Sequence, residues 1–432
     1  MSLIVKTDIR NRSDLIKEAK RAFIDYVASL RAASQEPAVK RVAHLLADSH
    51  FHSRLLGQNL HGSPENAALF NGFSSHYLDY DDAQANLRGH LSVVLFSALL
   101  AVTDETDHVQ RFLTAYDVGS EVEGLIGRLV NPQHTISGWH STCTIGPLGA
   151  AAAIGYYKGL DQESIARLLS LAGTQSSGMG FQSGTDTKPL HAGIAAKNAV
   201  LAYRLLVEAG LSSSDQPFNN DNGWIRTFSG KAFNADECFK SWNQPGQILS
   251  PGLWVKHHPF CSAAMCGADA ALLLWNKGIR FKNVKHIDIH YRPGGDAALK
   301  YHHPINGKQG KFSIEYIVWQ ILTTGTVDDA SFGDRPVSVE FSAAIEKFDR
   351  VHDLPIADQA KRETGMTIEM NDGRHLTSYI DNPLGSPENP LSDGRVVQKL
   401  TSSVGEQLAK QILKVISDWP NGSLRSFLKL NI

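Results

Sequence analysis

Cysteine is scarce in this chain of 432 residues, and four cysteines in such a length exclude a disulfide framework. They are Cys143, Cys238, Cys261 and Cys266. The last two lie five positions apart, without a second pair or a nearby group of further ligands, so reduced thiols are favoured over a zinc site. Reduced thiols are typical of the cytoplasm, where we expect this protein.

Long apolar runs and an excess of one charge are also missing. The most apolar stretch, residues 145–157, is too short to cross a membrane and is followed by Lys158. The first residues, MSLIVKTDIRNR, lack the apolar length of a signal peptide. Lysine and arginine number 42 against 44 aspartates and glutamates, a formal net charge of -2. We therefore expect no general affinity for nucleic acid or a membrane surface, although a local basic pocket for a small anion remains compatible.

The motifs of common cofactor-dependent enzymes are absent as well. The chain has no P-loop, no HExxH, no GxSxG elbow, and no GxGxxG between a predicted strand and a helix. Nucleotide, flavin and zinc-hydrolase chemistry therefore lack support, and we expect neither a cofactor nor a metal.

Helical periodicity dominates the first half of the chain. The predicted helices cover residues 14–31, 93–102, 145–157, 162–172 and 195–209. Asp161 is a candidate N-cap, and Gly210 follows the last of these helices. The second and third are rich in alanine and glycine, which lets helices approach closely, so we place them in the middle of a bundle.

Alternating periodicity appears only after about residue 280. Predicted strands cover residues 284–291 and 336–341, and a hairpin covers residues 366–380 around Asp372-Gly373. Residues 311–322 and 396–418 read as helices. We therefore predict a mainly α fold. A large all-helical domain is formed by residues 1–255 together with 391–432, and a smaller α+β lid domain by residues 256–390.

The densest group of chemically active side chains is HYLDYDDAQANLRGHLS, residues 76–92. If His90 meets Asp79, the carboxylate orients the imidazole and raises its basicity, as for a general base. Alternatively, Asp81 and Asp82 cap a helix or pair with Arg88. A magnesium site is a further alternative, disfavoured because no second acidic cluster matches it.

Three other segments carry candidate site residues. In GWHSTCTIGPLG, His140 precedes hydroxyl residues and a small-residue helix, whose start could hold an anion or simply be capped. In GTDTKPLHAG, Lys188 either holds a carboxylate from a partly buried position or lies exposed in a loop. In KHHPFC, at the predicted domain border, Lys256 and His258 either contact carboxylates or lie on the surface.

Taken in order, these segments resemble the MmgE/PrpD family over nearly the whole chain. The resemblance rests on AKRAFIDYVA, HYLDYDD, GWHSTCTIGPLGAAAA, GTDTKPLHAGIAAKNAVLA, KHHPFC, KFSIEY and GSPENPLS. Members of the family include 2-methylcitrate dehydratases, cis-aconitate decarboxylases and iminodisuccinate epimerases. The resemblance implies a helical domain with a smaller α+β lid, a homodimer, and activity on a small di- or tricarboxylate.

Carried over by position, the resemblance implies catalytic roles for Asp79, His90, His140, Lys188 and Tyr316. The resemblance also implies that Lys256 binds the substrate. Arg88 and His258 are further candidates for substrate binding because their side chains can be cationic. The sequence departs from the decarboxylases at Ala83, where they have a hydroxyl residue, and from many members at Leu91, where they have proline. DYDDAQANLRGH keeps the spacing and the Arg-Gly-His of the epimerases.

The reaction implied by the resemblance moves a proton at a carbon next to a carboxylate. Loss of hydroxide or carbon dioxide would make the protein a lyase, which is the preferred interpretation. Return of the proton to the opposite face would make it an epimerase or isomerase. A non-catalytic relative is disfavoured because all six candidate polar positions are present: Asp79, His90, His140, Lys188, Lys256 and Tyr316.

Overall fold

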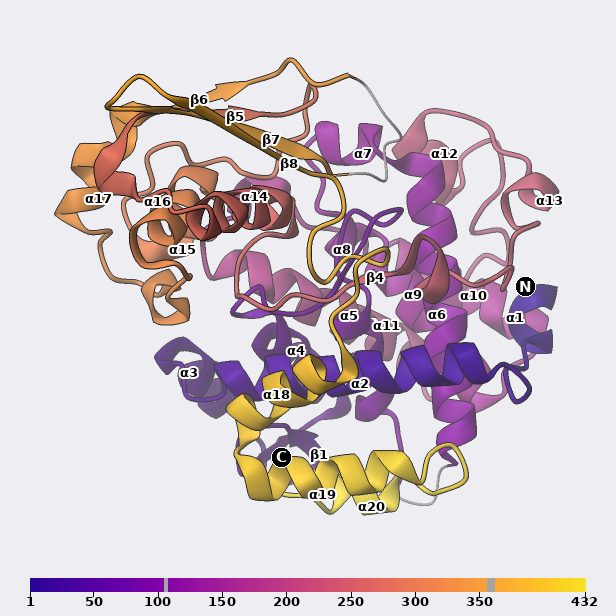
Figure 1. Ribbon diagram of the computed structural model, residues 1–432. Helices are drawn as coiled ribbons and strands as arrows, with labels where there is room; N and C mark the ends of the chain where they lie inside the picture. Colours follow the sequence, from indigo (N-terminus) through magenta and orange to yellow (C-terminus); the bar gives the residue numbers. More distant parts are fainter. Residues whose placement is uncertain (105–107, 356–361) are drawn as a thin grey trace. The chain divides into compact units, whose positions relative to one another are not determined.

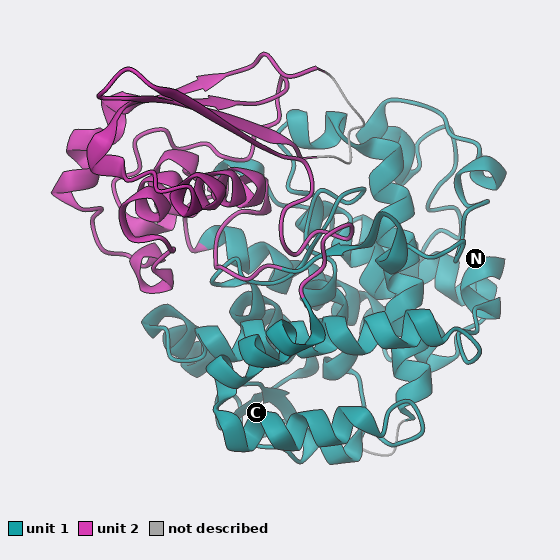
Figure 2. Ribbon diagram, in the orientation of Figure 1, with its two compact units in different colours: residues 1–181, 187–255, 392–432 teal, residues 182–186, 256–391 magenta. Residues whose placement is uncertain are grey.

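The structure, a computed structural model, describes residues 1–104, 108–355 and 362–432 (Figure 1). The chain forms two compact units (Figure 2). Unit 1 comprises Met1–Phe181, Thr187–Val255 and Ser392–Ile432, and unit 2 comprises Gln182–Asp186 and Lys256–Leu391. The domain borders predicted from the sequence lie at residues 255–256 and 390–391, and that prediction did not include the short segment Gln182–Asp186.

Unit 1 is built from helices with two short β ladders. Its helices are α1 (Ser2–Lys6), α2 (Ser13–Ala33), α3 (Pro37–Leu46), α4 (Pro64–His76), α5 (Ser92–Ala101), α6 (Val109–Val130), α7 (Gln133–Ile136), α8 (Ser141–Thr144), α9 (Gly146–Lys158), α10 (Gln162–Gly173), α11 (Thr187–Val207), α12 (Trp224–Ser229), α13 (Ala235–Cys238), α18 (Asp393–Val404), α19 (Glu406–Ser417) and α20 (Arg425–Leu428). Its strands pair as β1 (Ser53–Leu55) with β2 (Leu60–Gly62), and β3 (Ala83–Gln84) with β4 (Leu253–Trp254).

Two glycines bring α4 and α11 into close contact at the centre of unit 1. A Cβ on Gly193 would lie 2.1 Å from the backbone oxygen of Leu69, and one on Gly72 would lie 2.7 Å from the Cα of Gly193. Side chains are excluded at this crossing, so the two backbones touch directly. The glycines therefore fix how the end of α4 faces the beginning of α11.

The C-terminal segment packs onto α2 near the beginning of the chain (Figure 1). Lys399 of α18 donates a hydrogen bond of 2.6 Å to the Asp25 carboxylate of α2, and both side chains are buried. Gly57 donates its N–H to the carbonyl of Ile432 at 3.0 Å. Segments from both ends of the sequence thus complete one hydrophobic core.

Unit 2 contains a four-stranded mixed sheet in the order β6-β5-β7-β8. Its strands are β5 (Val284–His290), β6 (Phe348–Val351), β7 (Thr364–Met370) and β8 (His375–Ile380), and its helices are α14 (Met265–Asn276), α15 (Gly307–Gly310), α16 (Ile314–Thr324) and α17 (Val339–Ala344). Strands β5 and β6 run parallel, while β7 is antiparallel to both β5 and β8. Helix α14 packs against β7 and β8.

The mainly α fold with a smaller α+β part confirms the predicted fold class. The β7–β8 hairpin follows the Asp372-Gly373 prediction, with Gly373 at φ +85°. Asp161 caps α10 by accepting the N–H of Ser164 at 2.8 Å. No helix among the described residues is both long and apolar enough to span a membrane.

Two local predictions are wrong. Residues 336–341 do not form a strand, because Ser338 accepts the N–H of Phe341 at 3.1 Å and so caps helix α17. The third strand predicted there lies instead at β6, which pairs with β5. The helix expected over residues 396–418 is divided at Gly405, whose φ of 81° no helix accommodates.

Candidate active site

The turn between α4 and α5 gathers acidic and imidazole groups. Helix α4 ends at His76, and two non-glycine residues after it adopt left-handed backbone conformations, Asp79 at φ 56° and Arg88 at φ 52°. Such conformations are uncommon outside glycine, and aspartate tolerates them better than most residues. They fold the chain back so that Asp79, Asp81 and His90 lie near His76.

Asp81 lies between two imidazoles. Its Oδ1 is 2.8 Å from Nδ1 of His76, and its Oδ2 is 3.0 Å from Nδ1 of His90. Nδ1 of His90 also lies 2.7 Å from the carbonyl oxygen of Asp82. Carbonyl and carboxylate oxygens only accept hydrogen bonds, so both histidines carry a proton on Nδ1. In each neutral imidazole the basic lone pair is therefore on Nε2.

Lys188, in the first turn of α11, supplies a positive charge to the same place. Its Nζ lies 3.0 Å from Nε2 of His76 and 3.1 Å from Oδ2 of Asp79. The side chain of Lys188 is only 9% exposed, so the interpretation of it as an exposed loop lysine is wrong. The Gly72–Gly193 crossing places Lys188 there, because each glycine lies about one helical turn from the groups that meet.

These five residues close a circuit that we call the buried polar ring. It runs from Lys188 through His76, Asp81, His90 and Asp79 back to Lys188. Its longest step joins Nε2 of His90 to Oδ1 of Asp79 at 3.6 Å, beyond hydrogen-bonding range. The predicted Asp79–His90 pair is thus a contact without a hydrogen bond, and the groups at Nδ1 of the His90 imidazole are the Asp82 carbonyl and Asp81.

Burial controls the charges of the ring. It lowers the pKa of His76 to about 3, so this imidazole is neutral and its Nε2 accepts from the Lys188 ammonium. Burial alone would raise the pKa of Asp81, but electrostatic attraction to His76 and His90, and after it the hydrogen bond from His76, hold that pKa well below its usual value. Asp81 is therefore an ionised carboxylate between the imidazoles of His76 and His90.

A second pair of imidazoles lies beside the ring. His140 and His191 face each other with 2.9 Å between their Nδ1 atoms, and the ring of His140 stacks 6.4 Å from that of His76. Burial, and after it the charge of Lys188, lowers the pKa of both histidines, that of His191 to about 4. Both are therefore neutral, and only one of the two can donate through Nδ1.

The hydroxyl residues after His140 do not cap a helix. Thr142 accepts the backbone N–H of His90 at 3.1 Å, and Thr144 pairs with Nε2 of His134 at 2.6 Å. Helix α8 has four residues, and no side chain caps its start. The segment thus attaches the His90 loop to the core, and the prediction that its hydroxyls cap the helix is wrong, while the anion site stays a prediction.

The ring also has the composition of a metal site. The ligand atoms of His76, Asp79, Asp81 and His90 all lie within 4.8 Å of one another. However, the Lys188 ammonium already contacts two of these four groups, and its charge opposes a divalent cation beside it. The residues present thus fit an internal lysine cation better than a metal.

The remaining predicted residues lie outside the ring. Lys256 is fully buried in unit 2, and Tyr316 packs in an aromatic group with Phe332 and Phe341. His258 places its Nδ1 2.8 Å from the Asp329 carboxylate. Their participation in one site with the ring stays a prediction. In unit 1, Arg88 is half-buried, and its N–H binds the Gln84 carbonyl at 2.9 Å.

Sequence reasoning missed His76, Asp81 as an orienting group, and His191. His76 ends α4, three positions before Asp79, and His191 lies three positions after Lys188, on the same face of α11. The helical spacing of Lys188 and His191 could have indicated this shared face. The contact between His76 and Lys188 could not be foreseen, because it depends on how α4 crosses α11.

Comparisons with known proteins agree with this architecture. The model described as the MmgE/PrpD N-terminal domain matches residues 2–236, and that of the MmgE/PrpD C-terminal domain matches residues 258–420. Human cis-aconitate decarboxylase is 23% identical, over 94% of this chain and 87% of the human protein. Cis-aconitate decarboxylase of Aspergillus terreus is 22% identical, over 94% and 88%. The cis-aconitate decarboxylase-like protein oryM of Aspergillus oryzae is 25% identical, over 91% and 87%.

Proposed function

Because the chain belongs to the MmgE/PrpD family, we propose that it moves a proton at a carbon next to a carboxylate of a small di- or tricarboxylate, without a cofactor. The observation that carries this proposal is the buried polar ring. It holds an oriented imidazole, His90, and an ammonium, Lys188, on opposite sides of one carboxylate, Asp79.

The roles follow from the tautomers and charges. With Nδ1 of His90 bound to Asp81 and the Asp82 carbonyl, Nε2 is the atom available to accept a substrate proton. Removing that proton builds negative charge on the substrate carboxylate, which a preorganised cation stabilises. Lys188 is that cation, and neutral His140 is a further hydrogen-bond donor. Lys256, Arg88 and His258 as substrate-binding groups, and Tyr316 as the opposite-face acid, rest on sequence reasoning and resemblance.

A lyase is the first candidate reaction. The relatives named as cis-aconitate decarboxylases act, by their names, on a tricarboxylate, which supports elimination or decarboxylation of a related acid. An epimerase is the second candidate, favoured by Ala83. This residue is buried in β3 and offers no hydroxyl where the resemblance expects one for decarboxylation.

One experiment separates these candidates. A panel of di- and tricarboxylates is incubated with the protein in deuterium oxide and followed by NMR. We expect deuterium at the carbon next to a carboxylate together with an alkene or carbon dioxide, the lyase result. Exchange with inversion and no net loss would instead establish the epimerase. No exchange with any member of the panel would contradict the proposal and leave a non-catalytic relative.

A further inference from the structure

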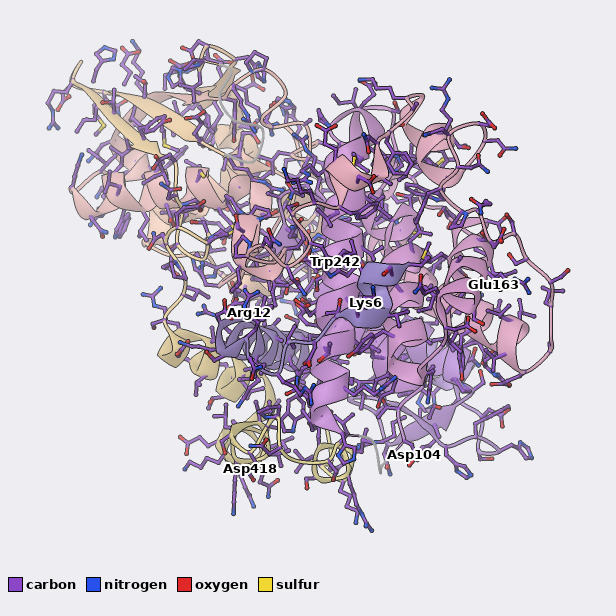
Figure 3. The ribbon with its side chains drawn as sticks, turned by 90° about the vertical axis from the view of Figure 1, so that its right-hand side faces the viewer. Lys6, Arg12, Asp104, Glu163, Trp242 and Asp418 are labelled. Carbon is purple, nitrogen blue, oxygen red and sulfur yellow. The ribbon has the colours of Figure 1, made fainter. Side chains whose placement is uncertain are left out.

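A groove separate from the buried polar ring runs along the outer face of α2. It encloses about 650 Å³ between α2, α18 and α19, all within unit 1. This volume is in the range of protein sites for small organic ligands. Two residues labelled in Figure 3 mark its place in the sequence: Arg12 precedes the lining residue Ser13, and Asp418 follows the lining residue Ser417.

The floor of the groove is apolar. It is formed by Ile16, Ile24, Val396, Val397, Leu413 and Ile416. The α2 members, Ile16 and Ile24, are half-buried and also pack against the hydrophobic core, so the groove exposes only part of each side chain. A ligand that filled this floor would gain from removing its own apolar surface from water, roughly in proportion to the buried area.

The rim of the groove is cationic. Arg10, Lys17, Lys20 and Arg21 line it together with one carboxylate, Asp393, and the Arg10 guanidinium is paired with the adjacent Asp8 at 2.6 Å. Asp393 is shared by two of these cations, at 3.6 Å from Lys17 and 3.4 Å from Arg21. Lys20 donates to the backbone carbonyls of Trp419 at 2.9 Å and Ser417 at 3.4 Å. The two carbonyl groups carry no net charge, so they position the Lys20 ammonium without neutralising it.

An apolar floor below a cationic rim matches one ligand chemistry. A small polar dicarboxylate would leave the apolar floor exposed to water. A neutral hydrocarbon would make no ionic contact with the cationic rim. We propose that the groove binds a single-chain anionic amphiphile of the fatty-acid type, with its carboxylate at Lys20 and its alkyl chain along α2. No residue of the ring lines this groove, so the proposal does not depend on the proposed reaction.

Calorimetric titration of the full chain with dodecanoate, below its micellar concentration, tests the proposal. We expect saturable binding, about tenfold weaker for decanoate, because two methylenes less are buried. Added salt should weaken binding by screening the rim. Dodecyltrimethylammonium, which has the same chain and the opposite charge, should not bind.

Variants locate the site. Lys20→Met should weaken dodecanoate binding about tenfold, since it removes one charged donor. Lys17→Met should also weaken dodecanoate binding. Lys17 lies on the exposed part of the rim, so its replacement should not affect folding. Lys40→Met is the matched control, since Lys40 is an exposed lysine of α3 outside the groove.

Three results would overturn the proposal. One is the absence of saturable dodecanoate binding, and another is equal binding of the cationic amphiphile. The third is a Val397→Asp variant that converts an oligomer into a monomer in light scattering while dodecanoate shows no binding, because the groove would then be an interface between copies of the chain.

Discussion

Asp81 and the Asp82 carbonyl determine what the neighbouring histidines can do. Asp81 accepts from Nδ1 of His76 and so directs the Nε2 lone pair of that imidazole away from itself, while Nδ1 of His90 donates to the Asp82 carbonyl, 3.0 Å from Asp81 Oδ2. One lone pair then meets the Lys188 ammonium and the other faces Asp79. The Asp81 carboxylate thus specifies the tautomer of His76, and the backbone carbonyl of Asp82 specifies that of His90, which proximity in sequence does not reveal.

His90 is expected to be the proton-transferring group. His90→Asn should lower kcat by about 10²–10⁴-fold, the range for loss of a general acid–base group. His44→Asn is the matched control, because His44 is an exposed histidine of α3 outside the ring, and it should leave kcat at that of the parent. Steady-state kinetics of both variants on the substrate found in the exchange panel provide the measurement. Unchanged turnover of His90→Asn would refute the mechanism without touching the family assignment.

Lys188 should act on substrate binding as well as on turnover. Lys188→Met removes the ammonium that contacts Asp79 and His76, so we expect KM to rise and kcat to fall together. Circular dichroism and thermal unfolding confirm that the variant is folded. A variant with wild-type KM and reduced kcat would show that Lys188 acts only after the substrate is bound.

Buried acids on α6 should make stability depend on pH. Burial and the neighbouring Glu121 raise the pKa of Asp117 from its ordinary 3.8 to about 8. The folded protein therefore holds a proton that the unfolded chain releases, and stability is lost as pH rises from about 4 to about 8. Urea unfolding at pH 5 and pH 8 measures this effect. Between these two pH values the free energy of unfolding should fall less for Asp117→Asn than for the parent protein. The exposed control Asp221→Asn should show the same change of unfolding free energy with pH as the parent. The same change in Asp117→Asn would contradict the role given to Asp117.

At the scale of elements, the crossing of α4 and α11 supports the ring. Gly193→Ala would place a methyl group 2.1 Å from the Leu69 carbonyl, so the helices must separate. Overpacking of this kind costs about 1–3 kcal/mol. We also expect lower activity, because Lys188 and His76 would move apart. Denaturant unfolding and kinetics measure both effects.

Gly394→Ala is the control for that substitution. This glycine lies in α18, where an added Cβ finds only Ser392 Oγ at 3.9 Å, so stability should stay the same or rise slightly. If Gly394→Ala lost as much stability as Gly193→Ala, the loss at Gly193 would not be specific to the α4–α11 crossing.

Elements whose pattern is local were predictable. Residues 14–31 and the Asp372-Gly373 hairpin formed as expected because periodicity and turn chemistry act within a few residues. Residues 336–341 were misread because alternation over so short a run competes with the Ser338 cap. In the site, the candidates were recognisable one by one, but their partners are set by packing between distant helices.

For the whole molecule, we expect activity to survive exhaustive dialysis against a chelator. The reason is the Lys188 ammonium, which lies where a divalent cation would need to bind His76 and Asp79. Activity is measured before and after dialysis. Loss on dialysis and recovery with magnesium would assign the ring to a metal instead.

A homodimer is the expected state of association, on the strength of the family resemblance. Light scattering at micromolar concentration should report twice the mass of one chain, 47.2 kDa. A monomeric mass at that concentration would contradict the expectation.

The pairing of Lys399 with Asp25 has a consequence for synthesis on the ribosome. The two residues are separated by 374 positions, and all of unit 2 is translated between them. Helix α2 therefore leaves the ribosome early, but α18 can pack onto it only after most of the polypeptide has been made. During that interval the face of α2 that α18 will cover is open to chaperones or to another nascent chain, while α4, α5 and α6 can already pack on its other side. Unit 2, whose main segment is continuous from Lys256 to Leu391, has no comparable delay.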